Sequence, residues 1–176
     1  AASVLVGDFL YSRSFQLMVG AENLIVLKML ADATNLISEG EVLQLLNRHN
    51  PETTESAYLD VLRYKTGTLF AASTQIGAML AGRPAVDIEA MQRFGETLGI
   101  AFQLIDDALD YCADAATLGK SLGDDLAEGK PTLPLIYALQ HATPNHKQVI
   151  QTALLEGDRS ALPVLLEIIE ACGALT

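Results

Sequence analysis

The sequence predicts an all-α fold, a bundle of long helices in a single domain. Apolar residues recur at spacings of three and four along nearly the whole chain, as in helices with one buried face. No stretch alternates cleanly between apolar and polar residues, as a half-buried strand does. The chain has 176 residues, of which 50% are hydrophobic and 19% charged. It is therefore able to bury a core without disulfides or a structural metal.

The first half of the chain predicts three long helices. The first covers residues 3–18, and the second covers residues 22–48 and stops at Pro51. Thr53 or Thr54 caps the third helix, since a threonine hydroxyl accepts a hydrogen bond from a free backbone N–H at a helix start. Its apolar face contains Tyr58, Leu62, Leu69 and Ile76.

The second half predicts one more long helix and three shorter ones. A Gly-Arg-Pro turn at residues 82–84 precedes a helix over residues 87–111. Residues 114–131 are rich in glycine, aspartate and lysine, and we predict a loop there. The shorter helices are expected near residues 133–141, 144–155 and 160–172.

Polar residues gather on one side of the helix predicted over residues 87–111. Gln103, Asp106, Asp107 and Asp110 share an arc of about 100° on a helical wheel. The rest of the circumference is apolar, which inverts the proportions of a surface helix. We therefore expect neighbours to pack this helix on most sides, with its carboxylates directed into a polar cavity.

The three aspartates predict a magnesium site. Carboxylates this close repel one another unless a cation lies between them. An oxygen-only ligand set suits Mg²⁺, and the spacing gives a partial shell that leaves positions for water and a substrate phosphate. The alternative is a solvated acidic patch at a helix end.

Three lysines are candidates for binding an anion beside that metal. Lys120 and Lys130 flank the glycine-rich loop that follows the aspartates, and Lys65 precedes Thr66 in a weakly charged helix. The alternatives are a mobile solvated loop and a lysine whose stem packs while its charge reaches solvent.

The net charge of −11 argues against a nucleic acid or an anionic membrane as partner, because both require clustered basic residues. Cys112 and Cys172 lie far apart without a companion motif, so we expect neither a disulfide nor a zinc site. We also expect no signal peptide, no membrane span and a cytoplasmic location.

Together these motifs resemble the trans-polyprenyl diphosphate synthases, most of all the bacterial long-chain type that makes octaprenyl and similar quinone side chains. The resemblance spans essentially the whole chain. Its most specific parts are the sequence from Gly99 to Asp110, with Phe-Gln followed by Asp-Asp-x-x-Asp, and the sequence from Gly119-Lys120 to Gly129-Lys130-Pro131-Thr132. Supporting motifs are Gly7-Asp8, Gly40-Glu41 with Gln44, and Lys65-Thr66.

The resemblance implies antiparallel helices around a deep cavity, a homodimer, and Mg²⁺-dependent elongation of an allylic diphosphate, such as farnesyl diphosphate, with isopentenyl diphosphate. It assigns Mg²⁺ binding to Asp106, Asp107 and Asp110. It assigns contact with the diphosphate to Lys65, Lys120 and Lys130, and a place beside the reacting allyl group to Thr66 and Gln103. For Asp8, Glu41 and Gln44 we expect buried polar bonding between helices.

Family members also carry a first aspartate-rich motif with an adjacent arginine pair, which residues 1–176 do not contain. We therefore expect this chain to be a fragment of a longer synthase domain and to be inactive alone. Two alternatives remain: a class I terpene cyclase or squalene-synthase relative, and a non-catalytic regulatory subunit of a prenyl synthase.

Overall fold

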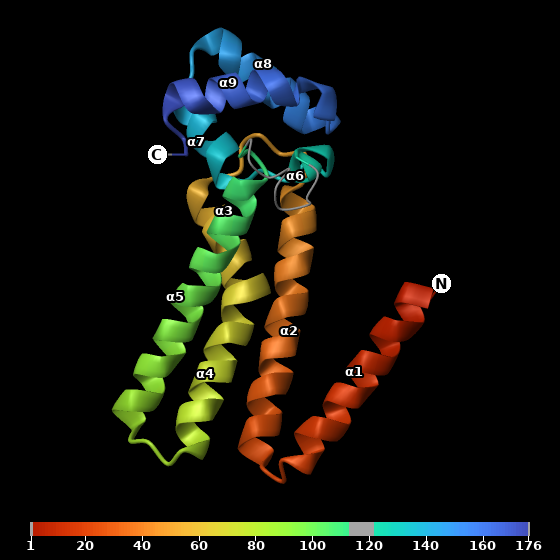
Figure 1. Ribbon diagram of the computed structural model, residues 1–176, viewed down its shortest axis with the longest axis vertical. Coiled ribbons are helices and arrows are strands. Elements are labelled where there is room, and N and C mark those ends of the chain that lie inside the picture. Colours follow the sequence, from red (N-terminus) through yellow and green to blue (C-terminus); the bar gives the residue numbers. More distant parts are fainter. Residues whose placement is uncertain (1, 113–121, 176) are drawn as a thin grey trace.

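The structure is a computed structural model that describes residues 2–112 and 122–175, and this part of the chain contains helices and no strand. Its first half consists of α1 (Ala2–Gly20), α2 (Leu24–Asn47), α3 (Glu55–Leu62), η1 (Arg63–Gly67), α4 (Thr68–Leu80) and α5 (Ala85–Leu109). Figure 1 shows α2, α4 and α5 side by side in alternating directions, whereas α1 diverges from them. The predicted all-α fold is confirmed.

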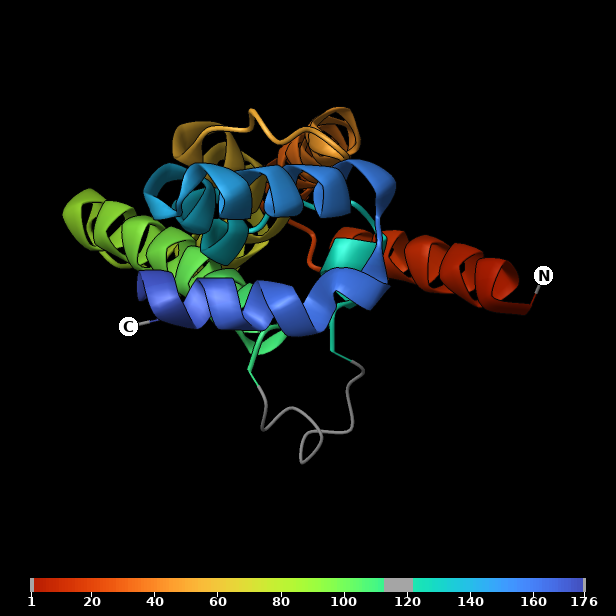
Figure 2. The same ribbon diagram turned by 90° about the horizontal axis from the view of Figure 1, so that it is seen from above.

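The remaining helices form a C-terminal lobe, residues 122–172, at one end of the long helices. It consists of α6 (Asp124–Ala127), α7 (Leu133–His141), α8 (Pro144–Glu156), η3 (Arg159–Ala161) and α9 (Leu162–Cys172). Seen from above, α8 and α9 lie across the ends of the bundle (Figure 2). The core of the C-terminal lobe is a continuous cluster that includes the fully buried Leu126, Leu135, Ile150, Leu154 and Leu165.

A smaller cluster joins the lobe to the bundle. Tyr58 and Leu62 of α3 pack against Ile136 of α7, with partly buried side chains of α5 around them. This contact fixes the last turns of α5, which carry the aspartates, against the start of α7. The two halves of the candidate site are therefore held together by apolar packing directly behind it.

A π-helical turn interrupts the third helix that the sequence predicts as continuous. The N–H of Thr68 donates to the carbonyl of Arg63, five residues back, so the turn holds one residue more than an α-helical turn. Lys65 and Thr66 lie within it. Gly40 allows α2 to approach this turn closely, because a Cβ at Gly40 would lie 2.7 Å from the backbone nitrogen of Lys65.

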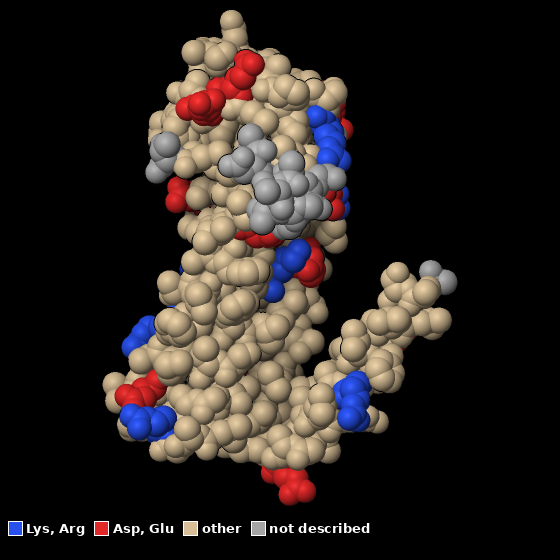
Figure 3. Space-filling model, viewed as in Figure 1, with Lys and Arg blue, Asp and Glu red and all other residues tan. Residues whose placement is uncertain are grey.

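The packing predicted around residues 87–111 is wrong for the described part of the chain. Helix α5 packs closely on its glycine side against α4, but Phe102 and Ile105 are 58% and 62% exposed. Figure 3 shows that the face of the long helices visible there carries few charged side chains along its middle. Even so, none of the described helices is both long and apolar enough to cross a membrane.

The loop predicted for residues 114–131 is also only partly right, because the short helix α6 forms within it. The backbone N–H groups of Gly123, Asp124 and Asp125 donate to the carboxylate of Asp110. A carboxylate beside the free N–H groups at a helix start stabilises that start. The Asp110 side chain, 14 residues before Asp124 in the sequence, thus stabilises the start of this helix.

We predict that Gly95→Ala lowers the unfolding free energy by about 1–3 kcal/mol, the usual effect of overpacking. A Cβ at Gly95 would lie 2.3 Å from Thr74 Oγ1 and 2.4 Å from the Phe70 carbonyl oxygen. Urea denaturation measures the change. The control is Gly77→Ala in α4, where a Cβ meets nothing within 4 Å and helix propensity favours alanine. Equal stability changes in the two variants would contradict the close crossing.

Candidate functional site

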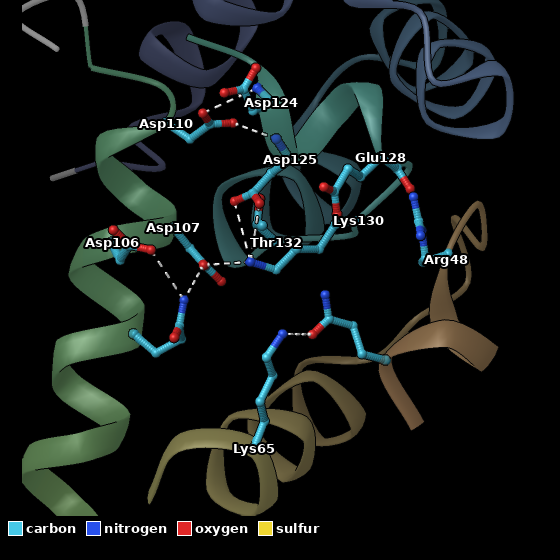
Figure 4. A network of polar contacts seen from close by, with 12 residues as sticks. Arg48, Lys65, Asp106, Asp107, Asp110, Asp124, Asp125, Glu128, Lys130 and Thr132 are labelled. Atoms are coloured by element: carbon cyan, nitrogen blue, oxygen red, sulfur yellow. Dashed lines mark hydrogen bonds and ion pairs between the residues drawn. The ribbon is translucent and has the colours of Figure 1, made fainter. Parts of the chain in front are cut away.

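The aspartates lie on the last turns of α5, facing the segment that links α6 to α7 (Figure 4). Gln103 lies on the same helix, one turn before Asp106 and Asp107. Gln103 Nε2 donates to Asp107 Oδ1 at 2.9 Å and lies 3.4 Å from Asp106 Oδ2. Asp110 is the C-cap residue of α5. The helical wheel therefore placed the four polar side chains on the correct common face.

Asp107 is a buried carboxylate that three side chains share. Its side chain has no exposed surface, and Lys130 Nζ lies 2.7 Å from Oδ1. The hydroxyl of Tyr58 donates to Oδ2 at 2.7 Å. Burial, followed by the charge of Asp107, raises the pKa of Tyr58 far above its ordinary value, so the hydroxyl keeps its proton and acts as the donor.

Lys130 is held between two carboxylates. Besides Asp107 it contacts both oxygens of Asp125, at 3.2 and 3.3 Å, and its side chain is 12% exposed. Burial lowers the pKa of Lys130, but the charges of Asp107 and Asp125 raise it to a net value above the ordinary one. Burial raises the pKa of Asp125 to about 6, partly offset by Lys130.

The backbone before Lys130 is fixed by the end of α2. His49 N–H donates to the Gly129 carbonyl at 2.7 Å, and Arg48 Nε donates to the Glu128 carbonyl at 2.6 Å. Gly129 has φ +67°, and a Cβ there would lie 2.3 Å from the His49 ring. The glycine of the Gly-Lys pair is therefore required by both its conformation and its neighbour.

Lys65 and Thr66 reach the site from the π-helical turn. Lys65 Nζ donates to Gln44 Oε1 at 2.8 Å and pairs with Glu41 at 3.2 Å. Thr66 Oγ1 donates to Gln103 Oε1 at 3.1 Å. The structure thus brings together the Lys-Thr pair and Gln103, and Glu41 and Gln44 bond to Lys65 between helices. The expected burial is wrong for Asp8 and Glu41, which are both exposed.

Sequence reasoning missed Tyr58, Arg48, His49 and Asp125 as parts of this site. Tyr58 was assigned to an apolar face, which is correct for its ring, but periodicity carries no information about a hydroxyl partner on another helix. Lys120, predicted to contact the anion, lies outside the described residues. The predicted roles of the other site residues remain predictions.

The donor set fits a hard cation only as a partial shell. Asp107 and Asp110 each accept three hydrogen bonds from the protein, which leaves about one of the four acceptor positions of each carboxylate. Within residues 2–112 and 122–175, no three histidine, cysteine or acidic side chains are grouped so that they could hold a metal ion. Any metal here therefore needs water and ligand oxygens to complete its coordination.

The sequence profile of the polyprenyl synthetase family matches residues 1–170. The chain belongs to this family. It is 51% identical over 176 residues to the octaprenyl diphosphate synthase of Escherichia coli K12, covering 99% of this chain and 54% of that protein. It is 48% identical to an all-trans-nonaprenyl-diphosphate synthase (geranyl-diphosphate specific) of Rhodobacter capsulatus, covering 98% of this chain and 53% of that one.

Among solved structures, a polyprenyl synthase from Caulobacter crescentus CB15, complexed with calcium and isoprenyl diphosphate, superimposes with a TM-score of 0.92 at 43% identity. The alignment covers 99% of this chain and 54% of that chain. The isoprenoid-synthase type of helical fold is confirmed by this match. This member of the polyprenyl synthetase family thus spans about half the length of the relatives it matches.

We predict that Lys130→Met lowers the unfolding free energy by about 3–5 kcal/mol, because it leaves the buried Asp107 carboxylate without its cation. Adding Asp107→Asn should recover part of the loss, since the unpaired charge is then removed. Chemical denaturation measures both variants. The control is Lys28→Met, which removes an exposed pair with Asp32 and should change stability by less than about 1 kcal/mol. A Lys130 variant no weaker than this control would refute the buried pairing.

A second prediction concerns pH. Because the pKa of Asp125 is about 6 in the folded protein and 3.8 ordinarily, the folded state binds this proton more tightly. The group's contribution to stability is thus complete below about pH 4 and is lost as the pH rises through 6, by about 1–3 kcal/mol.

Urea titrations between pH 4 and 7, without divalent metal, compare the original chain with Asp125→Asn. The unfolding free energy of the original chain, minus that of the variant, should fall across this range. The exposed Asp32→Asn provides the matched control. A difference that stays constant with pH would contradict the raised pKa.

Proposed function

We propose that the complete protein is a Mg²⁺-dependent prenyltransferase. It elongates an allylic diphosphate, such as farnesyl diphosphate, with isopentenyl diphosphate to a long-chain all-trans polyprenyl diphosphate, and we assign the product to quinone side chains. The names of the relatives support the reaction class. Those two names specify different chain lengths, so the proposal does not fix the number of prenyl units.

One observation carries this proposal. Lys130, from the C-terminal lobe, and Lys65, from the π-helical turn, extend into the same space beside the aspartates of α5 (Figure 4). The two lysines can contact a polyanion directly, and the carboxylates at the end of α5 can contact it through a bound metal ion. A diphosphate with bound Mg²⁺ has this charge pattern.

For the metal we propose Asp106, Asp107 and Asp110 as the protein's oxygen donors. Asp106 is half-buried. Because Asp107 and Asp110 already accept three hydrogen bonds each, we assign them a single acceptor position or a bridging water. When bound, Mg²⁺ supplies Lewis-acid charge that stabilises the departing diphosphate.

The side chains themselves have separate parts in the chemistry. Lys65 and Lys130 hold fixed positive charge where negative charge develops as the allylic C–O bond breaks. Thr66 Oγ1 and Gln103 Oε1 are oxygen dipoles that stabilise the transient allylic cation. The double bond of isopentenyl diphosphate attacks this cation, and we assign the released proton to the diphosphate. His49 and His141 are bonded to backbone carbonyls away from this reaction, so neither is assigned as a base.

We extend the proposal to a homodimer in the cytoplasm. Helix α1 has no buried residue, and its exposed apolar side chains include Leu5, Phe9 and Leu10. A contiguous apolar surface of this kind marks a contact with another protein segment or chain. A second copy of the protein is the partner that we propose.

The experiment uses the complete protein, Mg²⁺, farnesyl diphosphate and isopentenyl diphosphate, with products separated by chromatography. Asp106→Ala should lower kcat by two or more orders of magnitude, as expected for loss of a group that stabilises transition-state charge. Asp32→Ala, an exposed aspartate of α2, should retain activity. Residues 1–176 alone should give no elongation.

Near-normal turnover of Asp106→Ala would overturn the metal assignment. A complete protein that elongates no substrate, yet raises the activity of a separate synthase, would instead establish the regulatory subunit. A cyclised hydrocarbon product would establish the terpene cyclase.

A further inference from the structure

The side chain that completes the pairing of Asp107 is Tyr58, which belongs to none of the family motifs. Its ring packs in the cluster that joins α3 to α7, and the residue is 4% exposed. Its hydroxyl donates to Asp107 Oδ2 at 2.7 Å. The buried end of this tyrosine is therefore directed at the carboxylate that holds Lys130.

Asp107 divides its two oxygens between two kinds of donor. Oδ1 accepts from Lys130 Nζ at 2.7 Å and Gln103 Nε2 at 2.9 Å, whereas Oδ2 accepts from Tyr58. The three donors come from three segments: α3, α5 and the link between α6 and α7. The Tyr58 hydroxyl consequently fixes the rotation of the carboxylate about its own axis, and with it the position of Oδ1.

The position of the Lys130 ammonium group needs to be fixed, because its flexible four-carbon side chain can adopt many rotamers. Lys130 Nζ donates to Asp107 Oδ1 and to both oxygens of Asp125, and the contact with Asp107 is the shortest of the three. If Tyr58 donated nothing, Oδ2 would be a buried acceptor without a partner. The carboxylate would then turn towards the ammonium group or admit water.

We propose that Tyr58 is a positioning residue: through Asp107 it holds the ammonium group of Lys130 in the place where it contacts a diphosphate. It does so without adding a charge. A second cation in place of the hydroxyl would add positive charge and change the electric field at the diphosphate. The neutral hydroxyl gives Oδ2 a hydrogen-bond donor, and Lys130 remains the cation at this position. The inference rests on the proposed function and goes beyond its assigned residues.

The chain offers a matched control. Tyr111 is also buried and also ends in a hydroxyl bond, accepting from Thr132 Oγ1 at 3.2 Å. Both Tyr→Phe changes remove one buried hydroxyl and preserve the ring. They differ in that the Tyr58 hydroxyl bonds to Asp107 and interacts with the Leu133 backbone, whereas the Tyr111 hydroxyl bonds to Thr132.

The experiment measures binding of inorganic pyrophosphate with Mg²⁺ to the complete protein by calorimetry, together with steady-state kinetics. Tyr58→Phe should weaken pyrophosphate binding about three- to tenfold, consistent with a hydrogen bond to a charged group acting indirectly. It should raise KM for the allylic diphosphate more than it lowers kcat. Tyr111→Phe should leave both quantities within about twofold of the original protein, although its stability falls.

A double variant tests the route. In a Lys130→Met background, Tyr58→Phe should have no further effect on pyrophosphate binding, because the group that it positions is gone. Unchanged binding in Tyr58→Phe, equal losses in the two tyrosine variants, or full additivity with Lys130→Met would each overturn the inference while leaving the proposed function intact. If the original protein binds no pyrophosphate and elongates nothing, the proposed function fails, and the positioning role fails with it.

Discussion

The site depends on one buried carboxylate that is shared by three donors. Asp107 has no exposed side-chain surface, and burying a charge in this way is unfavourable unless the charge is paired and fully hydrogen-bonded. Lys130, Gln103 and Tyr58 meet that requirement from three separate segments. In turn, α3, α5 and the link between α6 and α7 must adopt their observed positions for the carboxylate to be hydrogen-bonded. Stability and site geometry are thus set by the same contacts.

A similar principle operates one turn further along α5. Asp110 accepts hydrogen bonds from three backbone N–H groups at the start of α6. The aspartate-rich sequence thus stabilises the fold as well as supplying negative charge. On the opposite side, glycines at positions 40, 95 and 99 permit the helix approaches that bring the Lys-Thr pair to Gln103. Charged groups hold the end of the site at the start of α6, and glycines, which have no side chain, allow the close helix spacing on the other side.

The sequence was sufficient for the helical fold, the helix ranges to within a few residues, and the common face of Gln103 and the aspartates. These follow from periodicity and capping, which are local properties. It was not sufficient for the π-helical turn at residues 63–67, because one additional residue per turn leaves no periodic trace in so short a segment. Nor did it predict α6 or the partners of Tyr58, since each depends on a contact between residues distant in sequence. The expected packing around α5 failed because a helical wheel shows which side is apolar and not what covers it.

The position of the cores bears on how the polypeptide acquires its structure during synthesis. Helix α1 has no buried residue, whereas the fully buried leucines and isoleucines, apart from Leu62 of α3, gather in the lobe formed by residues 122–172. The carboxylate end of α5 becomes ordered only after α7 has been translated, because Lys130 and Ile136 complete its surroundings. The surroundings of Asp107 are therefore complete only once a residue 23 positions further along the chain has been made.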